Sequence, residues 1–228
     1  MPTINSFIRF LHASPGTPAV NIYADGNLIF QDVAYNETSE YLPVGPEDMH
    51  IQVFPAGDDS KPLIDTNVTI PPSERITFAI IGTPNDVSLL PIFLTGEPIT
   101  TNDGRIRFAN LSPMTANLDL VIKNGPQFND VEYTHVTDFE TIAPSTYDLE
   151  LHLAGEDEVL LEETLQVNER TAYTVYTVRL PEGEPPLDIG YYQDQIPFIG
   201  SIIKETEFRK KKVLGTAPKI NFIYSDNN

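Results

Sequence analysis

Apolar and polar residues alternate strictly along two stretches of the chain. Residues 49–53 read Met-His-Ile-Gln-Val, and residues 147–152 read Tyr-Asp-Leu-Glu-Leu-His. A period of two places successive side chains on opposite faces of a β-strand. The pattern therefore predicts strands with one buried and one solvated face, with His50 and His152 on the solvated face. No stretch shows the 3.6-residue period of an amphipathic helix.

Other short β-prone runs are separated by turn-forming residues. Asp25-Gly26-Asn27 and Asn124-Gly125 are typical of hairpin turns, because glycine adopts positive φ at little cost. Twenty prolines and thirteen glycines are spread along the chain, as expected for many short strands. The further predicted strands are Val20–Ala24, Leu63–Ile70, Ile76–Ile81, Leu118–Ile122, Val159–Val167 and Thr171–Val178.

The chain also repeats itself at an offset of 98 residues. Such a period is longer than a solenoid unit and matches the length of a small β-sandwich domain. After a shorter loop, Glu74-Arg75 aligns with Glu169-Arg170. The pairs at offset 98 are Ile8-Arg9-Phe10 with Ile106-Arg107-Phe108, Ser14-Pro15 with Ser112-Pro113, Phe30–Tyr35 with Phe128–Tyr133, and Ala56-Gly57 with Ala154-Gly155.

Pattern and repeat together predict an all-β protein made of two tandem immunoglobulin-like antiparallel β-sandwich domains. We place the first at residues 1–98 and the second at 104–190, with the linker around 97–104. Residues 181–186 are interpreted as a loop or linker, and the chain from Leu187 onward has no equivalent of similar length in the first repeat. Residues 191–228 are predicted to be a basic tail carrying an extra edge strand at Lys219–Tyr224.

The opening of the first repeat resembles a known family. Ile8–Gly16 and then Val20–Gly26 show an arginine strand, a Ser-Pro turn, an alternating strand and an Asp-Gly turn, and the second repeat follows the pattern with Asn124-Gly125 as its turn. This pattern is similar to that of the domain of unknown function 4397. The resemblance covers about residues 4–180 and implies a β-sandwich, often in tandem and often on exported or envelope-associated bacterial proteins. It implies no activity and transfers no functional residue.

Charge is distributed unevenly along the chain. The formal net charge is −19, which argues against nucleic acid as a partner because phosphate binding needs a basic surface. Residues 200–228 hold six basic and three acidic residues, a net charge of +3, so the other 199 residues carry −22. We therefore expect a protein partner or self-association.

Cysteine usage and the N-terminus limit the chemistry and bear on the compartment. The chain has no cysteine, which excludes disulfides, thiolate metal sites and cysteine nucleophiles. Residues 1–10 show no basic region followed by an apolar run, so no classical signal peptide is expected in this chain. No stretch reaches the roughly 20 apolar residues of a membrane-spanning helix. The family resemblance suggests a cell-surface or extracellular place, and the cytoplasm stays open.

Residues kept in both repeats are the first candidates for a site. Arg9 and Arg107 could contact a ligand, and so could Arg75 and Arg170. The alternative is that they pair with nearby carboxylates such as Glu74 and Glu169 or donate hydrogen bonds to loop carbonyls. Ser14 and Ser112 precede proline and are interpreted as turn residues, because no Gly-x-Ser-x-Gly motif surrounds them.

Metal sites are weakly indicated. The four histidines (His12, His50, His135 and His152) form no HExxH or HxH motif. Three loop clusters offer carboxylate or amide oxygens suited to calcium, namely Asp58-Asp59, Asn102-Asp103 and Glu156-Asp157-Glu158, although a solvated charge run explains them equally. We assign no catalytic, cofactor-binding or metal-ligating residue and expect no cofactor, with calcium as the alternative.

These observations favour a non-enzymatic, surface-associated assembly or binding module, with self-association through its C-terminal strand as one form of assembly. Two alternatives stay open: a hydrolase with a site between the domains, and a module that binds glycans or small ligands. A lone strand at Lys219–Tyr224 cannot bury its apolar face alone, so our hypothesis is that it pairs with a sheet edge of its own second domain or of a neighbouring copy, and a disordered tail is the remaining alternative.

Overall fold

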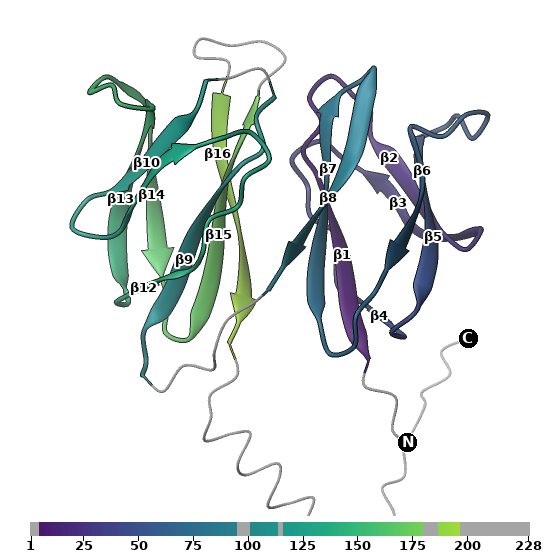
Figure 1. The fold of residues 1–228 in the computed structure, drawn as a ribbon, viewed down its shortest axis with the longest axis horizontal. Helices are drawn as coiled ribbons and strands as arrows, with labels where there is room; N and C mark the ends of the chain where they lie inside the picture. The colour runs from purple at the N-terminus through teal and green to yellow at the C-terminus, as the bar shows by residue number, and fades with distance from the viewer. Residues whose placement is uncertain (1–4, 95–100, 114–115, 180–186, 197–228) are drawn as a thin grey trace, which may run out of the picture.

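The computed structural model describes residues 5–94, 101–113, 116–179 and 187–196. Within these ranges the chain forms sixteen β-strands and no α-helix, arranged as two sandwiches that lie side by side (Figure 1). The fold class expected from the sequence is confirmed. In the described part of the chain, a helix long and apolar enough to cross a membrane is absent.

Each sandwich has an inner sheet, which faces the other sandwich, and an outer sheet. In the first sandwich the inner sheet runs in the order β4 (Leu42–Val44), β1 (Ser6–His12), β7 (Arg75–Thr83) and β8 (Asp86–Phe93). Its outer sheet runs β3 (Asn27–Val33), β2 (Val20–Ala24), β5 (Asp48–Pro55) and β6 (Ile64–Thr69).

The second sandwich repeats this order strand for strand. Its inner sheet runs β12 (Glu140–Ile142), β9 (Gly104–Asn110), β15 (Thr171–Arg179) and β16 (Leu187–Gln195). Its outer sheet runs β11 (Gln127–Val131), β10 (Leu118–Ile122), β13 (Ser145–Leu153) and β14 (Val159–Val167). The identical order confirms that the sequence repeat is a structural repeat.

Strand pairing is antiparallel throughout the described residues except at one place in each sandwich. There β1 pairs in parallel with β7, and β9 pairs in parallel with β15. Arg9 lies opposite Thr77 and Arg107 lies opposite Thr174, so β15 corresponds to β7 at an offset of 97. The alignment of Arg75 with Arg170 was therefore wrong. It rested on the Glu-Arg dipeptide that both repeats contain, but the two dipeptides lie two residues out of register relative to the paired strands.

The last strand requires a second correction. β16 pairs with β15 as β8 pairs with β7, so residues 187–195 do have an equivalent in the first repeat, while residues 197–228 lie outside the described residues. Only the connections differ, since Thr83 and Asp86 flank a tight hairpin whereas residues 180–186 connect β15 to β16. The second sandwich extends to Gln195, beyond the boundary placed at 190, and the expected boundary at 98 lies outside the described residues.

Alternating side chains build one apolar core in each sandwich. In β5, Met49, Ile51 and Val53 are buried while their neighbours are partly exposed, as the period of two predicts. The turn before β3 uses Asp25 and Gly26 at φ of 49° and 78°, which twists the hairpin in the favoured sense.

A third apolar cluster joins the two sandwiches. It lies between the inner sheets and includes Leu11 and Ile81 from the first repeat and Leu111 and Val178 from the second. The four sheets therefore stack in the order outer, inner, inner, outer, and the two repeats share a buried interface.

Candidate functional site

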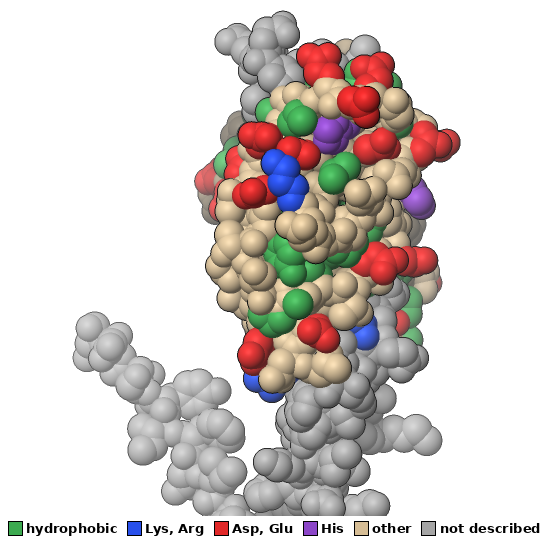
Figure 2. All heavy atoms as spheres, turned by 90° about the vertical axis from the view of Figure 1, so that its left-hand side faces the viewer, with side chains coloured by type: hydrophobic (Ala, Val, Ile, Leu, Met, Phe, Trp, Pro, Cys, Tyr) green, Lys and Arg blue, Asp and Glu red, His purple; other side chains and the backbone are tan. Residues whose placement is uncertain are grey.

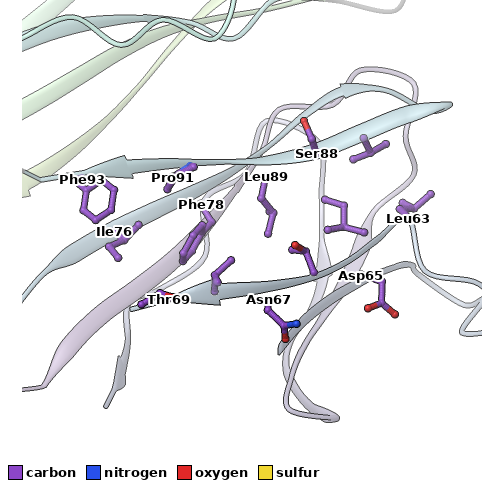
Figure 3. Close-up of a pocket in the computed structure, with 14 residues that line it drawn as sticks. Leu63, Asp65, Asn67, Thr69, Ile76, Phe78, Ser88, Leu89, Pro91 and Phe93 are labelled. Atoms are coloured by element: carbon purple, nitrogen blue, oxygen red, sulfur yellow. The ribbon is translucent and has the colours of Figure 1, made fainter. Parts of the chain in front are cut away.

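A groove with an apolar floor opens along one side of the first sandwich, between the edge strands β6 and β8. Its volume is about 640 Å³. Figure 3 shows Ile76 and Phe78 of β7 between the two strands, with Leu89 and Phe93 of β8 along one wall. Residues 63–69 form the other wall.

The groove exists because the two sheets of this sandwich do not close over their core. β6 is the last strand of the outer sheet and β8 the last strand of the inner sheet, and few residues of one lie near the other. Val68, Leu89 and Phe93 pack against the core cluster but are only partly buried. The groove is thus an unclosed section of hydrophobic core.

The two edges differ in their capacity to pair with another strand. An edge strand carries a row of backbone N–H and C=O groups without ladder partners. Pro91 interrupts the row on β8, because proline has no N–H to donate. β6 contains no proline, and in the described structure it pairs only with β5, so its outer side presents a continuous row.

Polar side chains line the outer face of β6. Asp65 accepts hydrogen bonds from His50 Nε2 at 2.7 Å and from Gln52 Nε2 at 2.9 Å. The hydrogen bond from His50, followed by that from Gln52, lowers the pKa of Asp65. This edge therefore carries a solvated negative charge beside an apolar groove.

At the corresponding floor position the second sandwich has a larger side chain. Ile76 corresponds to Tyr173, which is fully buried. The Tyr173 hydroxyl accepts hydrogen bonds from the backbone N–H of Asn168 at 3.0 Å and from its Nδ2 at 3.1 Å. Sequence analysis missed the groove, since this Ile–Tyr difference was hidden by the wrong alignment of β7 with β15.

The two repeated arginines lie in the interface between the sandwiches. Arg9 donates to Thr77 Oγ1 and, across the interface, to Asp194 Oδ2 at 2.9 Å. Arg107 donates to Thr174 Oγ1 and reaches the Phe93 carbonyl at 2.9 Å. Burial lowers the pKa of Arg107.

The family pattern described as "Domain of unknown function (DUF4397)" matches the chain over residues 6–121 and 104–195. Together the two matches cover most of the chain. The chain belongs to the DUF4397 family. Each match begins at the first strand of one sandwich, and no match was found among curated proteins.

Solved structures resemble the chain only distantly. One, titled "Alpha-glucan binding by a streptococcal virulence factor", is 10% identical, with 77% of this chain and 92% of the other covered and a TM-score of 0.25. A family 26 carbohydrate-binding module from Eubacterium rectale, in complex with maltoheptaose, is 11% identical (83% and 97% covered, TM-score 0.26). A putative cell adhesion protein from Bacteroides eggerthii is 9% identical (86% and 97%, TM-score 0.24). These neighbours are binding and adhesion proteins, but such low similarity carries no function over to a DUF4397 chain.

The remaining repeated residues hold the DUF4397 fold together. Arg75 lies over the Phe7 ring, with its Cζ 5.8 Å from the ring centroid. Ser14 is buried and donates to the Gly82 carbonyl at 3.0 Å, and its hydroxyl also lies 2.8 Å from that of Thr17. Arg9 pairs with the carboxylate of Asp194 and Arg107 donates to the Phe93 carbonyl, so both make structural contacts of the expected kind, with partners other than Glu74 and Glu169.

The four histidines lie apart from one another in different elements. His12 is fully buried: Nε2 donates to the Pro18 carbonyl at 3.0 Å and Nδ1 accepts from the Ser14 N–H at 3.3 Å. Desolvation lowers its pKa. His50 is half exposed, as expected. His152 lies on the outer face of β13 with Glu150, their Nε2 and Oε2 atoms 3.9 Å apart, but it is only 8% exposed, so the expectation of a solvated side chain was wrong. Strand alternation gives the face of a residue but not its burial by neighbouring side chains.

The three acidic loop clusters are not brought together. Asp58 accepts from the Ser60 N–H, and Asp59 accepts from the Tyr23 hydroxyl at 3.3 Å. The described residues contain no group of three or more His, Cys, Asp or Glu side chains placed to hold a metal ion. Calcium therefore has no assembled site in the described part of the DUF4397 chain.

A smaller pocket of about 320 Å³ lies between the repeats, where a hydrolase site was the alternative. Asp86 and Ser88 of the first repeat and Tyr133 and Thr134 of the second line it, and no histidine does. Burial raises the pKa of the Tyr133 phenol, with a contribution from the charge of Asp86. The described lining therefore holds no serine–histidine pair of the kind that acyl transfer commonly uses.

Proposed function

We propose that this chain is a non-catalytic binding module that accepts an extended polypeptide strand in the groove between β6 and β8. The observation that carries the proposal is an open apolar core between two edge strands. A segment laid there pairs its backbone with β6 and buries alternate side chains over Ile76 and Phe78, which is the β-strand-addition mode of peptide recognition.

The surroundings of the groove support this mode. Its walls are strands rather than loops, so the groove is built on rigid elements. Strand addition uses only backbone hydrogen bonds and apolar contact, so the proposal includes no cofactor and no reaction.

The net charge of residues 1–199 indicates which class of partner the groove would bind. Figure 2 shows many acidic and few basic side chains on the outer face of the second sandwich. Residues 1–199 carry −22, which favours a protein segment with basic flanks over a nucleic acid. The proposed partner is therefore an extended, apolar-alternating segment of a protein.

The test is a titration with a fluorescein-labelled peptide of alternating valine and threonine, with lysines at both ends. Val68 points into the groove from β6 and is partly buried, so Val68→Arg places a charged chain there without removing core volume. We expect at least a tenfold weaker affinity for that variant. Val159→Arg is the matched control, because Val159 is exposed on β14 of the second sandwich. Equal affinity for the two variants, or no binding up to millimolar peptide, contradicts the proposal.

One specific observation favours a second candidate, the binding of a saccharide on the outer face of the first sandwich. Tyr23 and Phe54 pack edge to face there with ring centroids 5.4 Å apart, and Gln52 and Asp65 lie on the same sheet. Aromatic rings beside polar hydrogen-bonding groups suit a sugar ring. Loss of glycan-array signal in Tyr23→Ala, with the signal retained in Val68→Arg, supports this candidate, and absence of any signal rejects it.

A further inference from the structure

We infer that the chain's own C-terminal segment, Lys219–Tyr224, is the strand that occupies the β6–β8 groove, where it competes with any external partner. The inference rests on the proposed function of the groove and names its resident ligand. The segment lies outside the described residues. Three features support its docking in the groove: the shape of the groove, the sequence of the segment and the length of chain that precedes it.

The segment has the pattern that the groove requires. Ile220, Phe222 and Tyr224 alternate with Asn221 and Ile223, so one face of an extended strand carries three large apolar side chains. The segment contains no proline or glycine. Its six residues equal the six residues of β6, a length of about 20 Å at the usual rise per residue.

The segment can reach the groove within its own chain. Residues 197–218 separate it from the end of the described structure, and 22 extended residues span at most about 75 Å. The four stacked sheets span roughly 30 Å between the mean planes of the outer two. A segment joined to the same chain is also present at a far higher local concentration than that of a second copy, which favours docking within one molecule.

The backbone groups exposed on the two edge strands favour pairing of the segment with β6. Pro91 removes a donor from β8, while β6 presents a continuous row of backbone groups. The polar face of β6 carries Asp65, and the segment begins at Lys219 within a tail of net charge +3. Attraction between tail and body assists docking at low ionic strength and is screened beyond about 8–10 Å at physiological salt.

If the tail occupies the groove, it competes there with an external strand. An external strand must displace Lys219–Tyr224 before it can pair with β6, so the tail lowers the apparent affinity of the module for its partner. In the second sandwich the fully buried Tyr173 fills the position of Ile76. The inference therefore applies to the first repeat alone.

The experiment is hydrogen–deuterium exchange of the full chain, followed by mass spectrometry. We expect the amides of residues 219–224 to exchange at least tenfold more slowly than those of the same sequence as a synthetic peptide. Phe222→Asp puts a charge on the apolar face and should abolish the protection, as should Val68→Arg in the groove. The matched controls are Asn221→Asp, on the opposite face of the segment, and Val159→Arg; both should keep the protection.

Each outcome decides the inference. Unprotected tail amides, or protection that persists in Val68→Arg, overturn it. Protection that grows with protein concentration, together with a doubled mass in light scattering, assigns the tail to a second copy and also overturns it.

A peptide titration separates this inference from the proposed function. If the inference is correct, Phe222→Asp binds the labelled peptide at least tenfold more tightly than the unchanged chain does. Equal binding by both rejects the tail as competitor while leaving the groove as a binding site. No binding by either rejects the groove itself.

Discussion

Arg9 of the first strand and Asp194 of the last described strand form a buried ion pair, with Nη2 and Oδ2 2.9 Å apart. Their side chains are 8% and 4% exposed, and the Arg9 guanidinium lies between the rings of Tyr41 and Tyr192 at 4.4 and 4.3 Å. This contact spans 185 residues and joins the two sandwiches. It makes the tandem repeat one packed unit.

The first prediction is that Asp194→Asn strongly destabilises the protein. Removing one partner leaves the Arg9 charge buried without compensation, which typically costs about 3–5 kcal/mol. Urea unfolding should show the lower midpoint. Asp65→Asn is the control, because its pair with His50 is exposed and should leave the midpoint nearly unchanged. Equal effects of the two substitutions would show that the interface does not depend on this pair.

The second prediction concerns pH. Burial lowers the pKa of His12 in the folded state, so below the unfolded value of 6.5 the unfolded chain binds more protons. This contribution to stability is fully present above pH 6.5 and decreases as the pH falls toward the folded pKa. Its slope is at most about 1.4 kcal/mol per pH unit.

The second repeat supplies the test of that prediction. Asn110 takes the place of His12: its Oδ1 accepts from the Ser112 N–H at 3.2 Å and its Nδ2 donates to the Val131 carbonyl at 3.0 Å. His12→Asn should therefore fold and lose less stability between pH 7 and 5 than the unchanged chain. His135→Asn, in an exposed loop, serves as control. A parallel loss in all three proteins would refute the role of His12.

The third prediction tests a compensating pair in the interface. Tyr176 and Gly190 correspond to Ala79 and Leu90, so a large residue faces a small one in both repeats but in opposite order. A Cβ on Gly190 would lie 2.5 Å from Cζ of Tyr176. Gly190→Leu alone should lower the melting temperature sharply.

The double variant should recover most of that loss, because Tyr176→Ala removes the clash. It should not recover all of it, since the Tyr176 hydroxyl donates to Asn36 Oδ1 at 2.9 Å. A double-mutant cycle on thermal unfolding measures the coupling between the two positions. Additive effects of the two substitutions would mean that the side chains do not compensate each other.

The fourth prediction is that Tyr173→Ile opens a groove in the second sandwich. The substitution removes a buried ring and the hydroxyl that Asn168 contacts, which should cost about 2–4 kcal/mol. If the groove takes up strands, the variant should bind two labelled valine–threonine peptides per chain where the unchanged chain binds one. A stoichiometry of one, with an intact fold by circular dichroism, would show that an open core is not sufficient.

Local signals in the sequence predicted much of the fold. β2, β10 and β14 have the bounds that the alternating runs indicated, and the turn at Asp25-Gly26 has the positive φ expected. These features depend on neighbouring residues, so a single sequence reveals them. The segment Lys219–Tyr224 stays a prediction, since it lies outside the described residues.

The site was not predictable in the same way. Arg9 and Arg107 were recognised as repeated, but their partners Asp194 and Phe93 lie far away in the chain. The groove depends on the distance between two edge strands, β6 and β8, that share no sequence signal. Their placement follows from how two whole sheets pack.

The sequence by itself determined the duplication, many of the strands and the buried face of β5, because a period of two and an offset of 98 are properties of the linear chain. Tertiary structure alone decided the register of β7 and β15, the partner of Arg9 and the opening over Ile76. Those features arise when strands distant in sequence meet. Whether a side chain fills the space between the sheets depends on all the strands packed around it.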